Sequence, residues 1–325
     1  MSLTQLLAEQ RPLILKGLVC DWPLVRHSAA SPITAMDYLA SFSNGALVVG
    51  YSGPPAINGR FFYDATLTGL NFTGERVDLK SYLERIRNHL DDPAPPSFYI
   101  GSTDLDGHLP GLRAETGLAL DDAGFGTASP IVSIWIGNRT VAAAHYDMSN
   151  NLACCAVGRR RFTLFPPEQV RNLYPGPLTP TPGGQVVSMV DFANPDYDAH
   201  PRFRNAIAAA EVADLEPGDV LFYPALWWHQ VEALDAFNVM INYWWNDAPA
   251  FMDTPMTTLL HGLLSLRDRP ATEKHAWREL FDYYVFGPAE LAGAHLPEAA
   301  RGDLGPMDER KARRLRADVL RRLNR

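Results

Sequence analysis

The sequence predicts a mostly β protein whose strands form a barrel or a sandwich, followed by a helical C-terminal part. Short apolar runs recur at close spacing through the first 250 residues, and several of them end at glycine or proline turn signals. Helical patterns do not alternate with these runs, as they would in a parallel α/β sheet. After residue 250 the apolar residues change to helical spacing.

The expected strands are short apolar runs bounded by turn residues. The first is a short buried strand within Arg11–Val19. The later ones are Ala46–Tyr51, Ser97–Gly101, Ile131–Ile136, Asn151–Val157, Arg161–Phe165, Asp219–Tyr223 and Asn238–Trp245. Helices are expected near Ile33–Phe42 and Asp78–His89.

The C-terminal part carries three helical patterns. Thr254 and Pro255 are typical of an N-cap and a first helical residue, and leucines follow at helical spacing. A second helix contains Trp277 and Phe281, and a third, strongly basic one lies near the C-terminus. We therefore expect two domains, a barrel over residues 1–250 and a helical subdomain over residues 251–325. The basic helix is either a solvated face or an interaction arm.

Composition excludes several classes of protein. A chain of 325 residues, 46% of them apolar, can bury a substantial core. The net charge of −8 disfavours tight binding to nucleic acid. No apolar stretch approaches the roughly 18 to 20 residues that span a bilayer, and the start lacks a signal-peptide pattern, so we expect a cytoplasmic protein without a membrane partner. Cys20, Cys154 and Cys155 are expected to be buried free thiols.

The strongest local signal is His145-Tyr146-Asp147, at the end of an extended region. Residues i and i+2 of a strand point to the same face, so an imidazole and a carboxylate would lie side by side. His229 follows a turn, a buried strand and two tryptophans. If the strands of His145 and His229 are neighbours in a barrel, the three side chains form the two-histidine, one-carboxylate face of non-haem Fe(II) oxygenases.

Seven ordered blocks of the sequence resemble the cupin-like branch of the JmjC oxygenases, and most of all the asparaginyl hydroxylase that inhibits hypoxia-inducible factor. The resemblance covers about residues 11–246. The blocks are His145–Asp147, Val157–Pro167, Leu173–Pro175, Asp191–Asp196, Pro217–Asp219, Trp227–His229 and Asn242–Trp244.

The resemblance implies a double-stranded β-helix (jelly-roll, cupin) barrel with flanking helices. It also implies that His145, Asp147 and His229 hold Fe(II), with 2-oxoglutarate bound to the same ion. The implied activity is a dioxygenase reaction, in which O2 converts 2-oxoglutarate to succinate and a substrate is hydroxylated. The substrate would be a protein side chain or a small molecule, and the resemblance favours hydroxylation over demethylation of methyl-lysine.

Five further residues match co-substrate positions of the family. Tyr99, Asn151 and Asn242 match residues that contact 2-oxoglutarate, and Trp244 matches an aromatic residue beside that pocket. Arg160 stands where relatives carry the lysine that pairs with the distal carboxylate of 2-oxoglutarate, and alanines replace a threonine expected before His145. Arg160 either takes over the role of the lysine or faces solvent.

Two other functions are compatible with the sequence. A non-catalytic cupin-like binding protein could keep the fold, and even a structural metal, without binding 2-oxoglutarate. A zinc cupin isomerase is disfavoured because such sites use more histidines. The apolar stripes of the C-terminal helices, including Leu259, Leu263, Trp277 and Phe281, further predict a homodimer, although these helices could instead only cap the barrel.

Overall fold

The structure is a computed structural model that describes residues 3–118, 125 and 129–324. The chain divides into two compact units, Met1–Asp247 and Ala248–Arg325. All described strands lie in the first unit. Across the described residues, no helix has both the length and the apolar character needed to cross a membrane.

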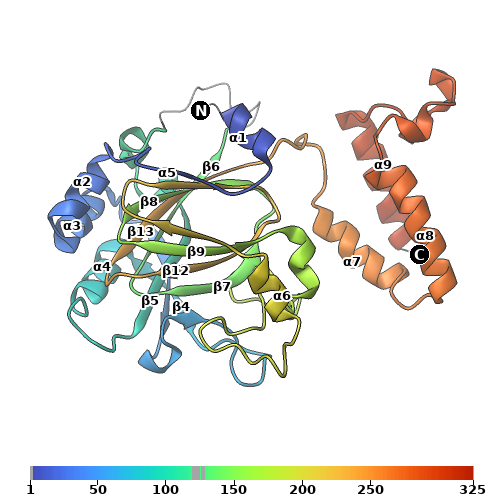
Figure 1. The fold of residues 1–325 in the computed structure, drawn as a ribbon. Helices are drawn as coiled ribbons and strands as arrows, with labels where there is room; N and C mark the ends of the chain where they lie inside the picture. The colour runs from blue at the N-terminus through green and yellow to red at the C-terminus, as the bar shows by residue number, and fades with distance from the viewer. Residues whose placement is uncertain (1–2, 119–124, 126–128, 325) are drawn as a thin grey trace. The chain divides into compact units, whose positions relative to one another are not determined.

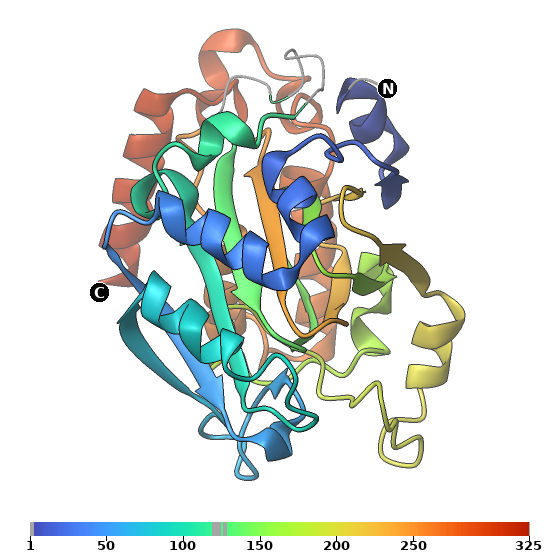
Figure 2. The same cartoon turned by 90° about the vertical axis from the view of Figure 1, so that its left-hand side faces the viewer.

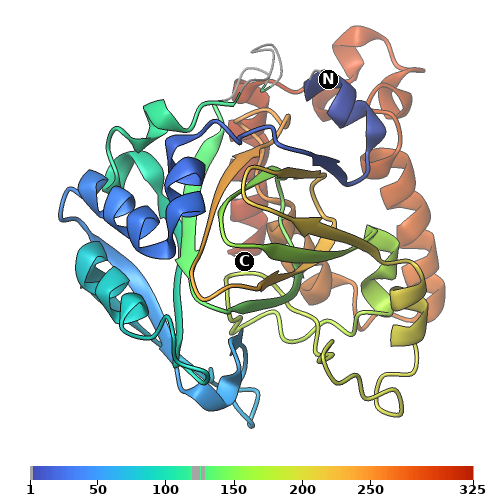
Figure 3. The same cartoon turned by 60° about the vertical axis from the view of Figure 1, so that its left-hand side comes forward.

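Two sheets form the first unit and lie face to face (Figure 1; Figure 3). The eight-stranded sheet has the order β1-β11-β8-β13-β6-β5-β2-β4, and the five-stranded sheet has the order β10-β9-β12-β7-β3. The strands are β1 (Leu13–Leu15), β2 (Leu47–Gly53), β3 (Arg60–Phe61), β4 (Thr73–Asp78), β5 (Ser97–Asp104), β6 (Ile131–Gly137), β7 (Val141–Tyr146), β8 (Asn150–Val157), β9 (Arg160–Phe165), β10 (Glu211–Leu215), β11 (Val220–Tyr223), β12 (Trp228–Ala233) and β13 (Asn238–Trp245).

Helices pack on the outer face of the eight-stranded sheet (Figure 2). Their starts follow local capping rules, since the Ser31 hydroxyl accepts a hydrogen bond from the Thr34 N–H and the Asp78 carboxylate accepts one from the Ser81 N–H. The helices of this unit are α1 (Leu3–Glu9), α2 (Pro23–Ala30), α3 (Pro32–Phe42), α4 (Leu79–Arg87), α5 (Leu105–His108) and α6 (Phe203–Ala208).

The central strand β8 separates two buried layers. Cys154 packs in the cluster between the large sheet and the helices, whereas Cys155 packs in the cluster between the two sheets. Burial raises the pKa of both thiols, that of Cys155 to about 12. The predicted burial is wrong for Cys20, which is exposed, because it lies in a turn rather than in a strand.

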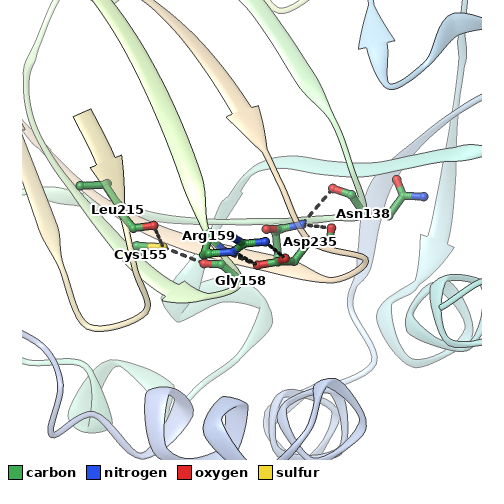
Figure 4. A network of polar contacts seen from close by, with 7 residues as sticks. Asn138, Cys155, Gly158, Arg159, Leu215 and Asp235 are labelled. Carbon is green, nitrogen blue, oxygen red and sulfur yellow. Dashed lines mark hydrogen bonds and ion pairs between the residues drawn. The ribbon is translucent and has the colours of Figure 1, made fainter. Parts of the chain in front are cut away.

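Two turns at one end of the first unit are joined by an ion pair (Figure 4). Gly158 connects β8 to β9 with a φ of +68°, and a Cβ there would lie 2.3 Å from the Asn238 side-chain oxygen. Next to it, the Arg159 guanidinium donates hydrogen bonds of 3.1 and 2.8 Å to the Asp235 carboxylate. The β8–β9 turn is therefore fixed against the β12–β13 turn.

The first strand is an edge strand, and it is half-buried rather than buried as predicted. It pairs with β11 alone, so one of its edges is open. The buried Asp219 carboxylate anchors the chain just after it, accepting hydrogen bonds from Lys16 Nζ at 2.7 Å, from Gly17 N at 3.0 Å and from Glu216 N at 2.9 Å.

The second unit contains α7 (Pro255–Ser265), α8 (Ala271–Phe281), a π-helical turn (Asp282–Phe286) and α9 (Glu309–Leu323). Thr254 caps α7 and Pro255 begins it, as the sequence predicts. None of these four segments contains a buried residue. Leu264 is 80% exposed and Phe286 is 74% exposed, so the second unit does not bury these large apolar side chains within itself.

Candidate active site

Adjacent strands of the smaller sheet bring the two predicted histidines together. β7 and β12 are antiparallel neighbours, and His145 lies directly opposite His229. Their ring centroids are 4.3 Å apart. Asp147 follows the end of β7 on the same side as His145, and its Oδ2 lies 3.6 Å from His229 Nε2. The pairing shifts just after His229, a bulge of the kind often found beside active sites.

Backbone carbonyls orient both imidazole rings. His145 Nδ1 lies 2.9 Å from the Ala143 carbonyl oxygen, and His229 Nδ1 lies 3.0 Å from the Trp227 carbonyl oxygen. These contacts assign the proton to Nδ1 of each ring and leave Nε2 with its lone pair available. Burial, together with the neighbouring His145, lowers the pKa of His229 to about 4, so this ring is neutral at pH 7.

His145, Asp147 and His229 form the ligand triad, the name used below for these three residues. One potential ligand atom from each lies within 4.8 Å of the other two. Two neutral imidazoles and one carboxylate are the donor set of Fe(II) oxygenases, which leaves coordination positions for other ligands. The residues present therefore fit a bound Fe(II) ion.

A cavity of 380 Å³ opens beside the triad, between the two sheets. All three triad residues line it, together with Tyr99 and Trp244. Its volume lies within the range usual for small-molecule sites. Asn242 lines it as well, so the cavity places three of the predicted co-substrate residues in the same space as the triad.

Hydrogen bonds link the two predicted asparagines to the triad. Asn151 Nδ2 donates to Tyr223 Oη at 2.5 Å and to Asp147 Oδ2 at 3.5 Å. Asn242 Nδ2 donates to Asn151 Oδ1 at 2.7 Å. Burial raises the pKa of Tyr223 well above its ordinary value, so the phenol remains protonated. This network holds the Asp147 carboxylate at the floor of the cavity.

Arg160 lies inside the barrel, which excludes the solvent-facing alternative. Its side chain is 2% exposed, whereas Arg159 and Arg161 are exposed and pair with Asp235 and Asp214. It shares a strand face with Phe162, whose ring lies 6.5 Å from that of His229. Burial lowers the pKa of Arg160, and no carboxylate of the described residues forms an ion pair with it.

Several polar atoms around the cavity have no partner in the chain. Among the described residues, eight buried side-chain nitrogen or oxygen atoms lack a hydrogen bond. Three of them belong to residues that line the cavity, and a fourth belongs to Arg160, which is not in the lining but lies near the lining residue Tyr99. Native proteins contain few such atoms, and ligands often satisfy them. The four are Trp135 Nε1, Arg160 Nε, Asn242 Oδ1 and Trp244 Nε1.

Sequence reasoning missed Tyr223 and Trp135, which also line the cavity. Tyr223 lies at the end of a strand expected only to be buried, and its hydroxyl contacts depend on strand pairing that the sequence does not display. Trp135 carries an indole N–H within a mostly apolar strand, and this N–H is the one feature of the sequence that indicates a role for it in the cavity. The segment from Thr181 to Gln185 forms another part of the lining.

Comparison with known proteins identifies the family. Residues 1–251 match the cupin-like domain family. The chain belongs to this family. The predicted cupin-like family and barrel fold are therefore confirmed.

This cupin-like chain is also similar to several characterised proteins. It is 36% identical to human HSPB1-associated protein 1 over 150 residues, which are 45% of this chain and 30% of that protein. It is 26% identical to lysine-specific demethylase 8 of Xenopus tropicalis over 244 residues, 74% of this chain and 49% of that protein. An Escherichia coli ycfD structure aligns with a TM-score of 0.44 and 16% identity, covering 100% of this chain and 68% of that one.

The cupin-like chain spans between about a quarter and a half of the length of the curated relatives that it matches.

Proposed function

We propose that this protein is an Fe(II)- and 2-oxoglutarate-dependent oxygenase that hydroxylates a protein side chain or a small molecule. The observation that supports it most is the ligand triad, in which two imidazoles and one carboxylate converge in the lining of a cavity. When bound, Fe(II) with 2-oxoglutarate and O2 supplies the oxidative chemistry that yields succinate and a hydroxylated product.

The chain's own residues bind, orient and shield the reacting groups. His145, Asp147 and His229 would hold the metal, and their backbone and side-chain contacts fix the direction of each ligand atom. Arg160 supplies a buried positive charge for the distal carboxylate of 2-oxoglutarate, and a guanidinium offers that group two parallel donors.

Tyr99, Asn242 and Trp244 would complete the co-substrate pocket. Asn151 contributes indirectly, through its hydrogen bonds to Asp147 and Asn242. The aromatic lining excludes water from the place where the substrate is oxidised.

An assay of uncoupled turnover tests the proposal. The purified chain is incubated with Fe(II), 2-oxoglutarate and O2, with and without pools of peptides and metabolites, and succinate is measured. We expect slow succinate formation that is abolished in His145→Ala and in Asp147→Ala, with the fold retained. Full activity in the variant that carries both alanine substitutions would contradict the proposed oxygenase function.

A non-catalytic cupin-like binding protein is the alternative function. An absence of succinate under all substrate pools, in a wild-type chain that binds metal, would support this alternative. The interior position of Arg160 favours the enzyme, because the alternative depends on a pocket that cannot anchor 2-oxoglutarate.

We further propose that the C-terminal helices form a homodimer. Apolar side chains of α7 and α8 remain exposed in the single chain, with Leu259 47% and Trp277 42% exposed. An isologous helical interface would cover them. Light scattering at micromolar concentration should give a dimer, and Trp277→Asp should shift it to a monomer. A monomeric wild-type chain would contradict this part of the proposal.

We also propose a cytoplasmic location. The three cysteines are free, and free thiols persist in a reducing compartment. Fractionation of cells that express the chain with a C-terminal tag would test this, with recovery in the membrane or extracellular fraction as the contrary result.

A further inference from the structure

Six aromatic rings form a continuous wall of the cavity, and we call them the aromatic wall. Tyr51 packs against Phe72 with ring centroids 5.6 Å apart, and Phe72 packs against Phe61 at 5.1 Å. The wall continues inward through ring contacts of 5.7, 5.9 and 5.7 Å. Its members are Tyr51, Phe72, Phe61, Tyr99, Trp135 and Trp244, all of which line the cavity.

The wall extends from the mouth of the cavity to the ligand triad. Leu70 and Phe72 line both the cavity and a shallow groove on the adjacent surface, so they mark the mouth. Tyr99 lies close enough to Asp147 and to the buried Arg160 for their charges to act on its hydroxyl, so it marks the inner end. A group that enters from the surface therefore passes along aromatic rings before it reaches Asp147.

The cavity offers no spare negative charge to a cation. Asp147 is the one carboxylate among the described residues of its lining, and it belongs to the triad. Arg160, near the lining residue Tyr99, adds a buried positive charge that no carboxylate of the described residues pairs with. If the site holds Fe(II) and 2-oxoglutarate, the charges of the ion, the co-substrate, Asp147 and Arg160 cancel, so the loaded site is neutral.

We propose that the substrate group which enters this cavity is uncharged and apolar or aromatic, and that ammonium and guanidinium groups are disfavoured. This inference rests on the proposed function, because it names the substrate class of that oxygenase site. Aromatic faces attract cations, but that attraction is smaller than the cost of removing a charge from water without a counter-ion. Apolar groups lose nothing on entry and gain contact with the wall.

Ligand-observed NMR tests the inference. The probes are the N-acetyl amides of phenylalanine, leucine, lysine and trimethyl-lysine, each titrated into the full chain in the presence of Zn(II) and 2-oxoglutarate. Saturation transfer from the protein reports binding of each probe. We expect the phenylalanine and leucine probes to bind at least about 10-fold more tightly than the two cationic probes.

A matched pair of variants locates the binding. Phe72→Glu introduces a carboxylate at the mouth and should raise the affinity for the lysine probe while lowering that for the phenylalanine probe. Phe72→Gln places a neutral side chain of similar size to glutamate at the same position. It should lower the affinity for the phenylalanine probe without raising the affinity for the lysine probe. Leu70→Glu repeats the test at an exposed position if Phe72→Glu fails to fold.

Several outcomes overturn the inference: equal or tighter binding of either cationic probe, no binding of any probe, or no change of preference in a folded glutamate variant. The proposed function is judged separately, by Mn(II) binding followed with electron paramagnetic resonance. A chain that prefers neutral probes but binds no Mn(II) keeps the inferred preference of the cavity and loses the oxygenase assignment.

Discussion

The ligand triad and the region next to it differ in whether the chain itself supplies hydrogen-bond partners to their polar groups. In the triad, the chain itself supplies partners: Ala143 and Trp227 carbonyls accept from the two rings, and Asn151 contacts Asp147. In the neighbouring region, which we propose binds the co-substrate and which comprises Tyr99, Arg160, Asn242 and Trp244, buried atoms of the last three residues have no hydrogen-bond partner among the described residues.

This difference indicates which region is complete before ligands arrive. An unsatisfied buried polar group costs about 1 to 3 kcal/mol, and a charged one costs more. The triad avoids that cost and is already arranged for a metal. The co-substrate region carries it, and a ligand with carboxylate oxygens would recover it on binding. Five predictions test this contrast.

The largest effect is expected for the triad. His145→Ala or Asp147→Ala should weaken Mn(II) binding by more than about 100-fold, because loss of a ligand exceeds the 10- to 100-fold effect of losing an outer partner. Electron paramagnetic resonance titration of Mn(II) measures it. Asp268→Ala, which removes an exposed carboxylate of the second unit, is the control. Unchanged Mn(II) affinity in either triad variant would remove that residue from the site.

The second effect concerns Arg160. Arg160→Ala removes the charge-assisted contacts of the guanidinium, so it should lower the affinity for 2-oxoglutarate by about 10- to 150-fold. Mn(II) binding should remain nearly unchanged. Anaerobic titration calorimetry measures both, with Arg269→Ala, an exposed arginine of the second unit, as the control. An unaltered affinity for 2-oxoglutarate would show that Arg160 is not its anchor.

The third prediction takes a carboxylate that the chain fully satisfies. Asp219→Ala should lower the free energy of unfolding by about 1 to 3 kcal/mol, because three donors lose their acceptor. Chemical denaturation measures this, and 2-oxoglutarate affinity should not change. A large loss of 2-oxoglutarate affinity with an unchanged free energy of unfolding would contradict the structural role of Asp219.

The stability that Asp219 confers should also depend on pH. Burial raises the pKa of Asp219, but the hydrogen bonds from Lys16 and the backbone outweigh burial and hold it below its ordinary value of 3.8. A carboxyl with a lowered pKa stabilises the fold above its unfolded value, and the benefit is lost as pH falls through the folded value. The difference between wild type and Asp219→Ala should therefore be full at pH 6 and shrink below pH 3.8.

The smallest effect has the opposite sign. Arg160→Met removes an unpaired buried charge, so it should raise the free energy of unfolding of the ligand-free chain by about 1 kcal/mol. The same variant should lose the stabilisation that 2-oxoglutarate gives to the wild type. Denaturation with and without 2-oxoglutarate measures both. A destabilised ligand-free Arg160→Met chain would mean that the chain already satisfies the guanidinium.

The sequence predicted much of this site because the relevant signals are local. The two-residue spacing of His145 and Asp147 gives a shared face, and the capping pattern at Thr254 gives the start of a helix. The strand Asn238–Trp245 was predicted to the residue because it is a long, mostly apolar run that is buried on both faces.

Other features depend on long-range pairing. Phe61 and Phe72 meet Tyr99 only because separate strands and loops fold over one cavity. The exposed strand β4 has the sequence of a loop, since an edge facing water needs few apolar residues. Whether Arg160 or its neighbours point inward depends on where β9 begins, which three consecutive arginines do not reveal.

The ion pairs on either side of Arg160 bear on the alignment of β9 within its sheet. Arg159 is held outside by Asp235 and Arg161 by Asp214, through two hydrogen bonds each (Figure 4 shows the first). A slip of one residue would reverse all three side chains, which would separate both outer pairs and bury two charges while releasing Arg160 to water. The two surface aspartates therefore favour the register of β9 in which Arg160 points into the barrel. Ion pairs on the outer face of the sheet thus help to position the charge on its inner face.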